Sequence, residues 1–326
     1  MTVKMHRQNR KRRKDTKMRL LLCGLVEILV VLALVIMIGW NYGVEGWLRQ
    51  FTHPVVRELD VSGINSTYAV LMQTEGGKII GEMNGEERMY PASLTKIMTA
   101  IVAVEELDSL DQEITLTAEM FAGLYERDAT QAGFQPDEIV RAIDLLYGVM
   151  LPSGAECCIA LADTISGSEE AFVDLMNRKA RKLGMEGTHF CDTTGLHDPE
   201  HYSTAKDMAV LLKYALRDDT FREIIESASH STPGTNIHPD GITFYSTMFK
   251  NLSDVNVTGG TILGGKTGFT NDAGLCLVSF AEVGGREYIL VTAGAPGNTG
   301  NPLHVQDAVA IYNRLGEAVQ ALENGE

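Results

Sequence analysis

The chain has 326 residues, of which 44% are hydrophobic and 22% are charged, and its formal net charge at pH 7 is −15. This length is sufficient for one large or two modest domains with substantial cores, and the composition is ordinary for a globular protein. Residues 1–19 carry nine of the 28 lysines and arginines, whereas residues 41–326 carry the other 19 together with 41 of the 43 acids, a net charge of −22. Because this body is strongly acidic, we expect no nucleic-acid partner.

An apolar run of 21 residues follows the basic segment, from Leu20 to Trp40, and Glu27 is its only charged residue. As a helix it would be about 31 Å long, close to the thickness of a bilayer's hydrocarbon core. The preceding cations should stay in the cytoplasm while the following chain crosses the membrane. Because no Ala-x-Ala-like cleavage site follows the run, we expect an uncleaved signal anchor rather than a cleaved signal peptide.

The anchor divides the chain into four predicted parts. Residues 1–19 would form a cytoplasmic basic tail and residues 20–40 a single transmembrane helix. Residues 41–60 would form a juxtamembrane linker, and residues 61–326 a domain outside the cytoplasmic membrane.

Strand-like sequence occurs at both ends of this domain. Residues 68–72 and 78–83 are apolar runs separated by Gln-Thr-Glu-Gly-Gly, which predicts a β-hairpin. Further strands are expected at 113–117, 242–248, 274–281 and 288–292, and helices at 93–107, 139–151, 155–165, 169–183, 208–216, 221–226 and 303–322. Strands at both ends with helices between them predict one antiparallel sheet built from the two ends, with a helical subdomain beside it.

The first candidate site residues are Ser93 and Lys96, three positions apart at the start of a predicted helix. Residues three apart share a helix face, so the lysine ammonium can reach the serine hydroxyl. A serine needs an adjacent base to act as a nucleophile, and a lysine can serve once burial or a second cation lowers its pKa. The alternative is a helix cap beside a solvated lysine.

Two further motifs lie downstream. Ser153 stands in Pro152–Gly154, at a break between two predicted helices where a side chain can project into a cleft. Lys266–Gly268, with the sequence Lys-Thr-Gly, immediately precedes the late strands. A lysine and a hydroxyl on a strand can bind a carboxylate, and a glycine leaves room for a ligand to lie along the strand. The alternative for this motif is an ordinary turn.

The order of these motifs, Ser-x-x-Lys, Ser-Gly-x and Lys-Thr-Gly, resembles that of the penicillin-recognising serine enzymes. The sequence around each motif is similar to the D-alanyl-D-alanine carboxypeptidases, the low-molecular-weight penicillin-binding proteins, over roughly residues 60–295. The resemblance implies an α/β fold of the α+β type, like that of β-lactamases and transpeptidases. Such a fold has a five-stranded antiparallel sheet flanked by helices, with an inserted helical subdomain.

The resemblance also implies a catalytic role for three residues. Ser93 would be acylated by the penultimate D-alanine carbonyl of a peptidoglycan stem peptide, and Lys96 would take its proton. Ser153 would relay a proton to the departing D-alanine. Water would then release the shortened peptide, so the reaction would need no metal and no cofactor.

The remaining site residues would bind the substrate. Lys266 and Thr267 would hold its free terminal carboxylate beside Gly268, and the N–H groups of Ser93 and Phe269 would form the oxyanion hole. The resemblance therefore implies a serine-type D-Ala-D-Ala carboxypeptidase that is also acylated by β-lactams. It would be a single-pass protein of the cell membrane with an extracellular catalytic domain.

One residue departs from the family pattern: Ala155 stands where the second motif normally ends in asparagine. Two alternatives remain open, and Ala155 favours the first of them. The first is a weakened family member that binds cell-wall peptide or scaffolds partners, and the second is a β-lactamase, for which Glu226 is the candidate deacylating residue. We expect Ala155→Asn to raise kcat/KM with little change in stability at a cleft position. We expect the neighbouring Glu156 to repel an anionic peptide terminus.

His197 and His201 mimic the two histidines of a His-x-x-Glu-His zinc motif. That motif needs both histidines on one helical face, and Pro199 between them opposes a helix. We therefore predict a turn rather than a metal site.

Overall fold

The computed structural model describes residues 55–325. The predicted basic tail and anchor lie outside the described residues, as does most of the predicted linker. The last part of that linker already belongs to the core, because Val56 is buried. Within the described range, no helix combines the length and the apolar character needed to cross a membrane.

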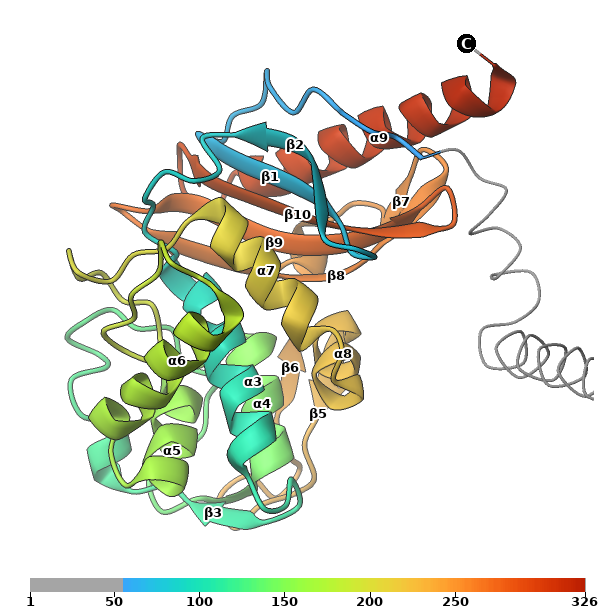
Figure 1. The fold of residues 1–326 in the computed structure, drawn as a ribbon. Coiled ribbons are helices and arrows are strands. Elements are labelled where there is room, and N and C mark those ends of the chain that lie inside the picture. The colour runs from blue at the N-terminus through green and yellow to red at the C-terminus, as the bar shows by residue number, and fades with distance from the viewer. Residues whose placement is uncertain (1–54, 326) are drawn as a thin grey trace, which may run out of the picture. The chain divides into compact units, whose positions relative to one another are not determined.

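An antiparallel sheet of six strands forms one layer of the fold, in the order β2-β1-β10-β9-β8-β7 (Figure 1). Its strands are β1 (Tyr68–Gln73), β2 (Lys78–Met83), β7 (Asn256–Val257), β8 (Gly260–Thr270), β9 (Gly274–Val283) and β10 (Arg286–Ala295). β1 pairs with β10, so that Val70 lies opposite Val291, and the sheet is built from both ends of the domain as predicted. The predicted hairpin is confirmed as β1 and β2.

The expectation of five strands is wrong by one edge strand. The short β7 pairs with the beginning of β8, where Val257 lies opposite Gly260. Gly259 has a φ of +67°, a conformation that glycine adopts without steric cost and that allows this tight turn. Because the Val257 side chain is buried in the core, the chain gains apolar burial by adding this strand.

The strand predicted at 242–248 forms, but it does not join the main sheet. Its central part, β6 (Thr243–Tyr245), pairs with β5 (Ser229–Ser231) in a separate two-stranded ribbon. A second ribbon pairs β3 (Glu113–Thr115) with β4 (Ile139–Arg141). The helix predicted from residue 139 therefore begins three residues later, because those residues form β4.

The helices agree closely with the sequence pattern. They are α3 (Lys96–Glu106), α4 (Ala142–Met150), α5 (Ala155–Ser166), α6 (Glu169–Leu183), α7 (Ala205–Ala215), α8 (Asp219–Glu226) and α9 (Leu303–Asn324), with 3₁₀ turns η1 (Ala92–Thr95), η2 (Ala118–Phe121) and η3 (Phe249–Asn251). The predicted cap of α7 forms, since the Thr204 hydroxyl accepts a hydrogen bond from the Asp207 N–H at 3.0 Å. Gly184, with a φ of +76°, ends α6.

Helices cover both faces of the sheet (Figure 1). Along β9, Cys276, Val278 and Phe280 belong to the core shared with α3 and the helical subdomain. The alternate residues Leu277 and Ala281 belong to the core shared with α9. This alternation follows from the two-residue period of a strand. The 3₁₀ turn η1 packs against β8, at the junction between the sheet and the helical subdomain.

Candidate active site

Ser93 and Lys96 come together as predicted. Ser93 lies in η1, where residues three apart are nearly eclipsed, and Lys96 is the first residue of α3. The Lys96 Nζ lies 3.2 Å from the Ser93 Oγ, to which it is hydrogen-bonded. Lys96 is 3% exposed, whereas Ser93 is half-buried, so the base is sheltered and the hydroxyl is open to a ligand.

A loop that sequence reasoning missed orients Lys96. The Lys96 Nζ donates a second hydrogen bond, of 2.7 Å, to the carbonyl oxygen of Thr194. The Asp192 carboxylate holds this loop by accepting from the N–H groups of Thr194 and Gly195 at 2.7 and 2.6 Å. Gly195 has a φ of +80°, and a Cβ there would lie 1.8 Å from the Ala92 carbonyl oxygen. Only glycine therefore lets the loop pack on η1. The turn-forming residues of this loop were the one feature of the sequence that could have indicated it.

The two histidines of the zinc-like sequence take separate partners. The buried His201 lies with its Nε2 2.8 Å from the Thr95 hydroxyl, and its Nδ1 accepts from the Cys191 N–H. His197 packs on the Tyr90 ring with a centroid separation of 4.8 Å. Among residues 55–325, no group of three metal-ligating side chains comes together.

Ser153 lies between α4 and α5 in a strained conformation. Its φ is +73°, a left-handed value that costs a non-glycine residue roughly 1–2 kcal/mol. The hydroxyl is buried and has no hydrogen-bond partner among the described residues. Strained backbone and an unsatisfied hydroxyl are features that collect at functional sites, where a ligand can complete them.

The structure corrects two expectations about the residues after Ser153. Ala155 is 1% exposed and does not line the cleft, so a larger side chain there must displace core neighbours. Glu156 is also fully buried, and its Oε1 accepts from the N–H groups of Ala132 and Gly133 at 2.6 and 3.0 Å. The Glu156 carboxylate fastens this loop to α5 instead of facing a substrate in the cleft, and burial raises its pKa.

The Lys-Thr-Gly motif lies on β8, facing η1. A Cβ on Gly268 would lie 2.9 Å from the backbone nitrogen of Ser93 and 3.1 Å from the Ala92 Cβ. This contact explains the glycine and places β8 directly beside the nucleophile candidate. The Thr267 hydroxyl is paired with that of Thr247 at 2.6 Å.

Lys266 is completely buried, and its Nζ donates to the carbonyl oxygen of Thr267 at 2.9 Å. Burial lowers the pKa of Lys266 well below its usual value, and the nearby Lys96 cation lowers it further. A carboxylate brought beside this lysine would offset both effects, so the site is suited to a ligand with a free carboxylate.

The predicted site residues meet at a cleft of about 760 Å³. Its lining includes Ser93, Ser153, Thr267, Gly268 and Phe269. Lys96 and Lys266 are not among the residues that line the cleft. Glu226 does not line it either, and it pairs with Arg222 in α8. A nucleophile, a buried base and a cationic strand around one cleft can perform acyl transfer on a peptide with a free C-terminus.

Replacing Gly268 with alanine should separate β8 from η1. We expect Gly268→Ala to slow acylation by penicillin about 5- to 10-fold, because the new methyl group displaces the Ser93 N–H from its place beside β8. The measurement is the second-order acylation rate, with thermal unfolding as a control for folding. A rate equal to that of the unsubstituted chain would show that this contact does not position the site.

Comparisons with known proteins show which sequences and structures this chain is similar to. The sequence profile of the D-alanyl-D-alanine carboxypeptidases of peptidase family S11 matches residues 55–297. The chain is 32% identical over 227 residues to the carboxypeptidase DacF of Bacillus subtilis, covering 70% of this chain and 57% of that protein. It is 34% identical over 248 residues to DacC of Escherichia coli, covering 73% of this chain and 58% of that protein. The chain thus spans less than two thirds of the length of these relatives.

A solved structure gives the same answer for the fold. The crystal structure of the Streptomyces K15 DD-transpeptidase superposes with a TM-score of 0.70 and 27% identity, covering 82% of this chain and 99% of that one. The expected α+β, transpeptidase-like fold class is therefore confirmed, with six strands in the sheet instead of five.

Proposed function

Since the chain belongs to the D-alanyl-D-alanine carboxypeptidase family, we propose that it is a serine-type D-Ala-D-Ala carboxypeptidase acting on peptidoglycan stem peptides. The observation that carries this proposal is the Lys96–Ser93 contact at a cleft whose other wall is the Lys-Thr-Gly strand. Among the alternatives, nothing in the cleft favours a β-lactamase or a binding protein without turnover.

The positions of the residues support the following reaction. Lys266 and Thr267 bind the terminal carboxylate, which sets the penultimate carbonyl against Ser93. Lys96 takes the hydroxyl proton while the Ser93 Oγ attacks the carbonyl carbon, and the N–H groups of Ser93 and Phe269 stabilise the oxyanion.

Collapse of the tetrahedral intermediate breaks the peptide bond. The departing D-alanine amine receives the proton held on Lys96 through the Ser153 hydroxyl, and an ester remains on Ser93. Water then attacks the ester carbonyl while Lys96 takes a proton from it. As the bond to the Ser93 Oγ breaks, that oxygen recovers the proton from Lys96, and the shortened peptide leaves with a new carboxylate.

Release of D-alanine tests this proposal. The full chain is incubated with a peptide ending in D-Ala-D-Ala, and free D-alanine is measured against a control peptide ending in L-Ala-L-Ala. We expect D-alanine from the first peptide and no release of alanine from the second. Failure of the folded chain to release D-alanine would contradict the proposed activity.

The lowered pKa of Lys266 gives the activity a distinctive pH dependence. Binding the terminal carboxylate requires the protonated lysine, so kcat/KM should fall as pH rises through that lowered pKa. The fall should begin well below about pH 10, where an ordinary lysine titrates. In Lys266→Arg the cation persists at all these pH values, so this alkaline fall should disappear. An identical fall in both proteins would assign it to another group.

The membrane arrangement is a second part of the proposal. We propose that residues 20–40 anchor the chain with its N-terminus in the cytoplasm and its catalytic domain outside, because nine cationic residues precede this apolar run. Protease added to intact protoplasts should then digest the domain. Digestion only after the cells are lysed would contradict this orientation.

A further inference from the structure

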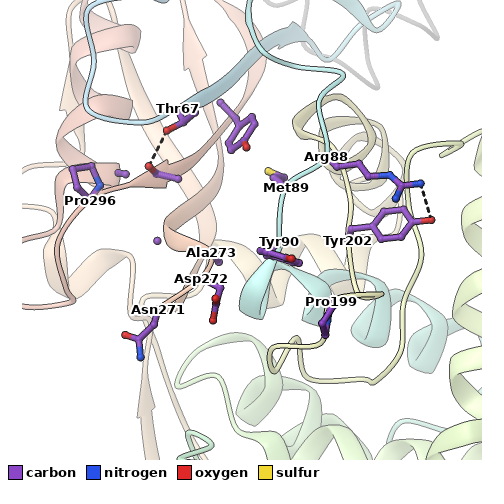
Figure 2. A pocket seen from close by; sticks show the side chains of 14 residues that line it. Thr67, Arg88, Met89, Tyr90, Pro199, Tyr202, Asn271, Asp272, Ala273 and Pro296 are labelled. Atoms are coloured by element: carbon purple, nitrogen blue, oxygen red, sulfur yellow. Dashed lines mark hydrogen bonds between the residues drawn. The ribbon is translucent and has the colours of Figure 1, made fainter.

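Figure 2 shows a second cavity, of about 550 Å³. Tyr68, Arg88, Tyr90 and Tyr202 contribute to its lining. The two hollows share Asn271 and Asp272, the residues that follow β8. Pockets of this size commonly hold small ligands, and none of the catalytic steps proposed above uses this one.

The direction of the proposed substrate leads toward this cavity. The terminal carboxylate is held at Lys266 and Thr267, and the cleaved bond lies at Gly268, next to Ser93. The rest of an extended peptide then runs along β8 toward Thr270, about 7 Å beyond Gly268 at roughly 3.3 Å per residue. The residues on the amino-terminal side of the cleaved bond therefore approach Asn271 and the second cavity.

Arg88 gives the cavity a positive charge in an otherwise acidic body. Its guanidinium lies 3.8 Å from the centroid of the Tyr202 ring and donates a hydrogen bond of 3.2 Å to the Tyr202 hydroxyl (Figure 2). The stacking restricts an otherwise flexible side chain. Within residues 55–325 Arg88 has no ion pair, so its remaining N–H groups are open to an anionic ligand.

Asp272 is the acidic residue in the lining, and its carboxylate is directed to another partner. It lies 3.6 Å from the Nδ1 of His197, whose ring packs edge-on against Tyr90. Asp272 lines both hollows, whereas His197 lines the catalytic cleft, so the partner of this carboxylate lies on the cleft side. The Arg88 side therefore remains suited to a carboxylate, and the neighbouring tyrosine rings are suited to the apolar faces of a peptide or a sugar.

We propose that this cavity is a subsite for the carboxylate-bearing, amino-terminal part of the stem peptide, with Arg88 pairing the carboxylate. The proposal rests on the proposed function, because it takes the direction of the substrate from the catalytic site. It makes the chain selective for long, acidic stem peptides over short ones.

Three substrates and three substitutions test this subsite in the full chain. The substrates are a capped tripeptide and two stem pentapeptides, all ending in D-Ala-D-Ala. One pentapeptide has a free carboxylate on a residue before the D-Ala-D-Ala terminus, and in the other that carboxylate is amidated. The unsubstituted chain should prefer the acidic pentapeptide to its amide by about 5- to 20-fold in kcat/KM, a typical effect of a charged hydrogen bond. In Arg88→Gln this preference should fall to within about two-fold.

Arg217→Gln is the matched control. It removes the same charge, and Arg217 is exposed and lies outside both hollows. It should keep the preference for the acidic pentapeptide. Tyr202→Phe keeps the ring but removes the hydroxyl partner of Arg88, and it should lower the preference only in part. An equal acid-to-amide ratio in the unsubstituted chain and in Arg88→Gln would overturn the subsite. Turnover of the capped tripeptide separates this outcome from failure of the proposed function, since that substrate does not reach Arg88.

Discussion

We expect one molecule of penicillin to attach covalently to the full chain, and Ser93→Ala to abolish this attachment. Penicillin presents a strained carbonyl and a carboxylate in the arrangement of an acylated D-Ala-D-Ala terminus. The only half-exposed hydroxyl in contact with Lys96 is that of Ser93 within residues 55–325. An alanine leaves no atom that can form the ester, so labelling should be lost completely. Intact mass spectrometry measures the added mass of one drug molecule.

Ser153→Ala is the matched control for this experiment. It removes a second hydroxyl from the same cleft but leaves the Lys96–Ser93 contact in place. We expect it to retain the covalent adduct, formed more slowly. If Ser93→Ala labels at the rate of the unsubstituted chain, then Ser93 is not the nucleophile.

Ala155→Asn has the second largest expected effect, and we expect it to raise kcat/KM for a D-Ala-D-Ala peptide. The amide would supply a donor and an acceptor two residues from Ser153, whose hydroxyl lacks a partner among the described residues. A hydrogen bond made only in the transition state is worth about 1–3 kcal/mol, which corresponds to roughly a 5- to 150-fold change in rate. Because Ala155 is buried, the larger side chain should also lower the stability of the fold by about 1–3 kcal/mol.

Ala155→Leu separates the two effects of this substitution. Leucine resembles asparagine in shape but has no amide, so it should destabilise the chain without raising kcat/KM. Thermal unfolding and peptide turnover are measured on both variants. A folded Ala155→Asn variant with unchanged or lower kcat/KM would show that the pocket has adapted to alanine, and would remove our account of Ala155 as a handicap.

The sequence determined the local parts of this protein. Ser93 and Lys96 meet because a spacing of three places both residues on one side of a single helical turn. The hairpin and the helix ends at Thr204 and Gly184 follow from neighbours in the chain. The order of the three motifs also indicated the family, since it requires no knowledge of which surfaces meet.

Only the tertiary structure decided contacts between segments distant in the sequence. The Thr194 carbonyl reaches Lys96 across 98 positions, and the loop carrying it has no marker except turn-forming residues. Ala155 looked like a cleft residue beside Ser153, but the direction of its side chain depends on how the first turn of α5 packs. Glu156 turns to the backbone at Ala132 because a buried carboxylate needs donors, and those donors come from another segment. Such long-range pairings are set by packing, which a local pattern does not encode.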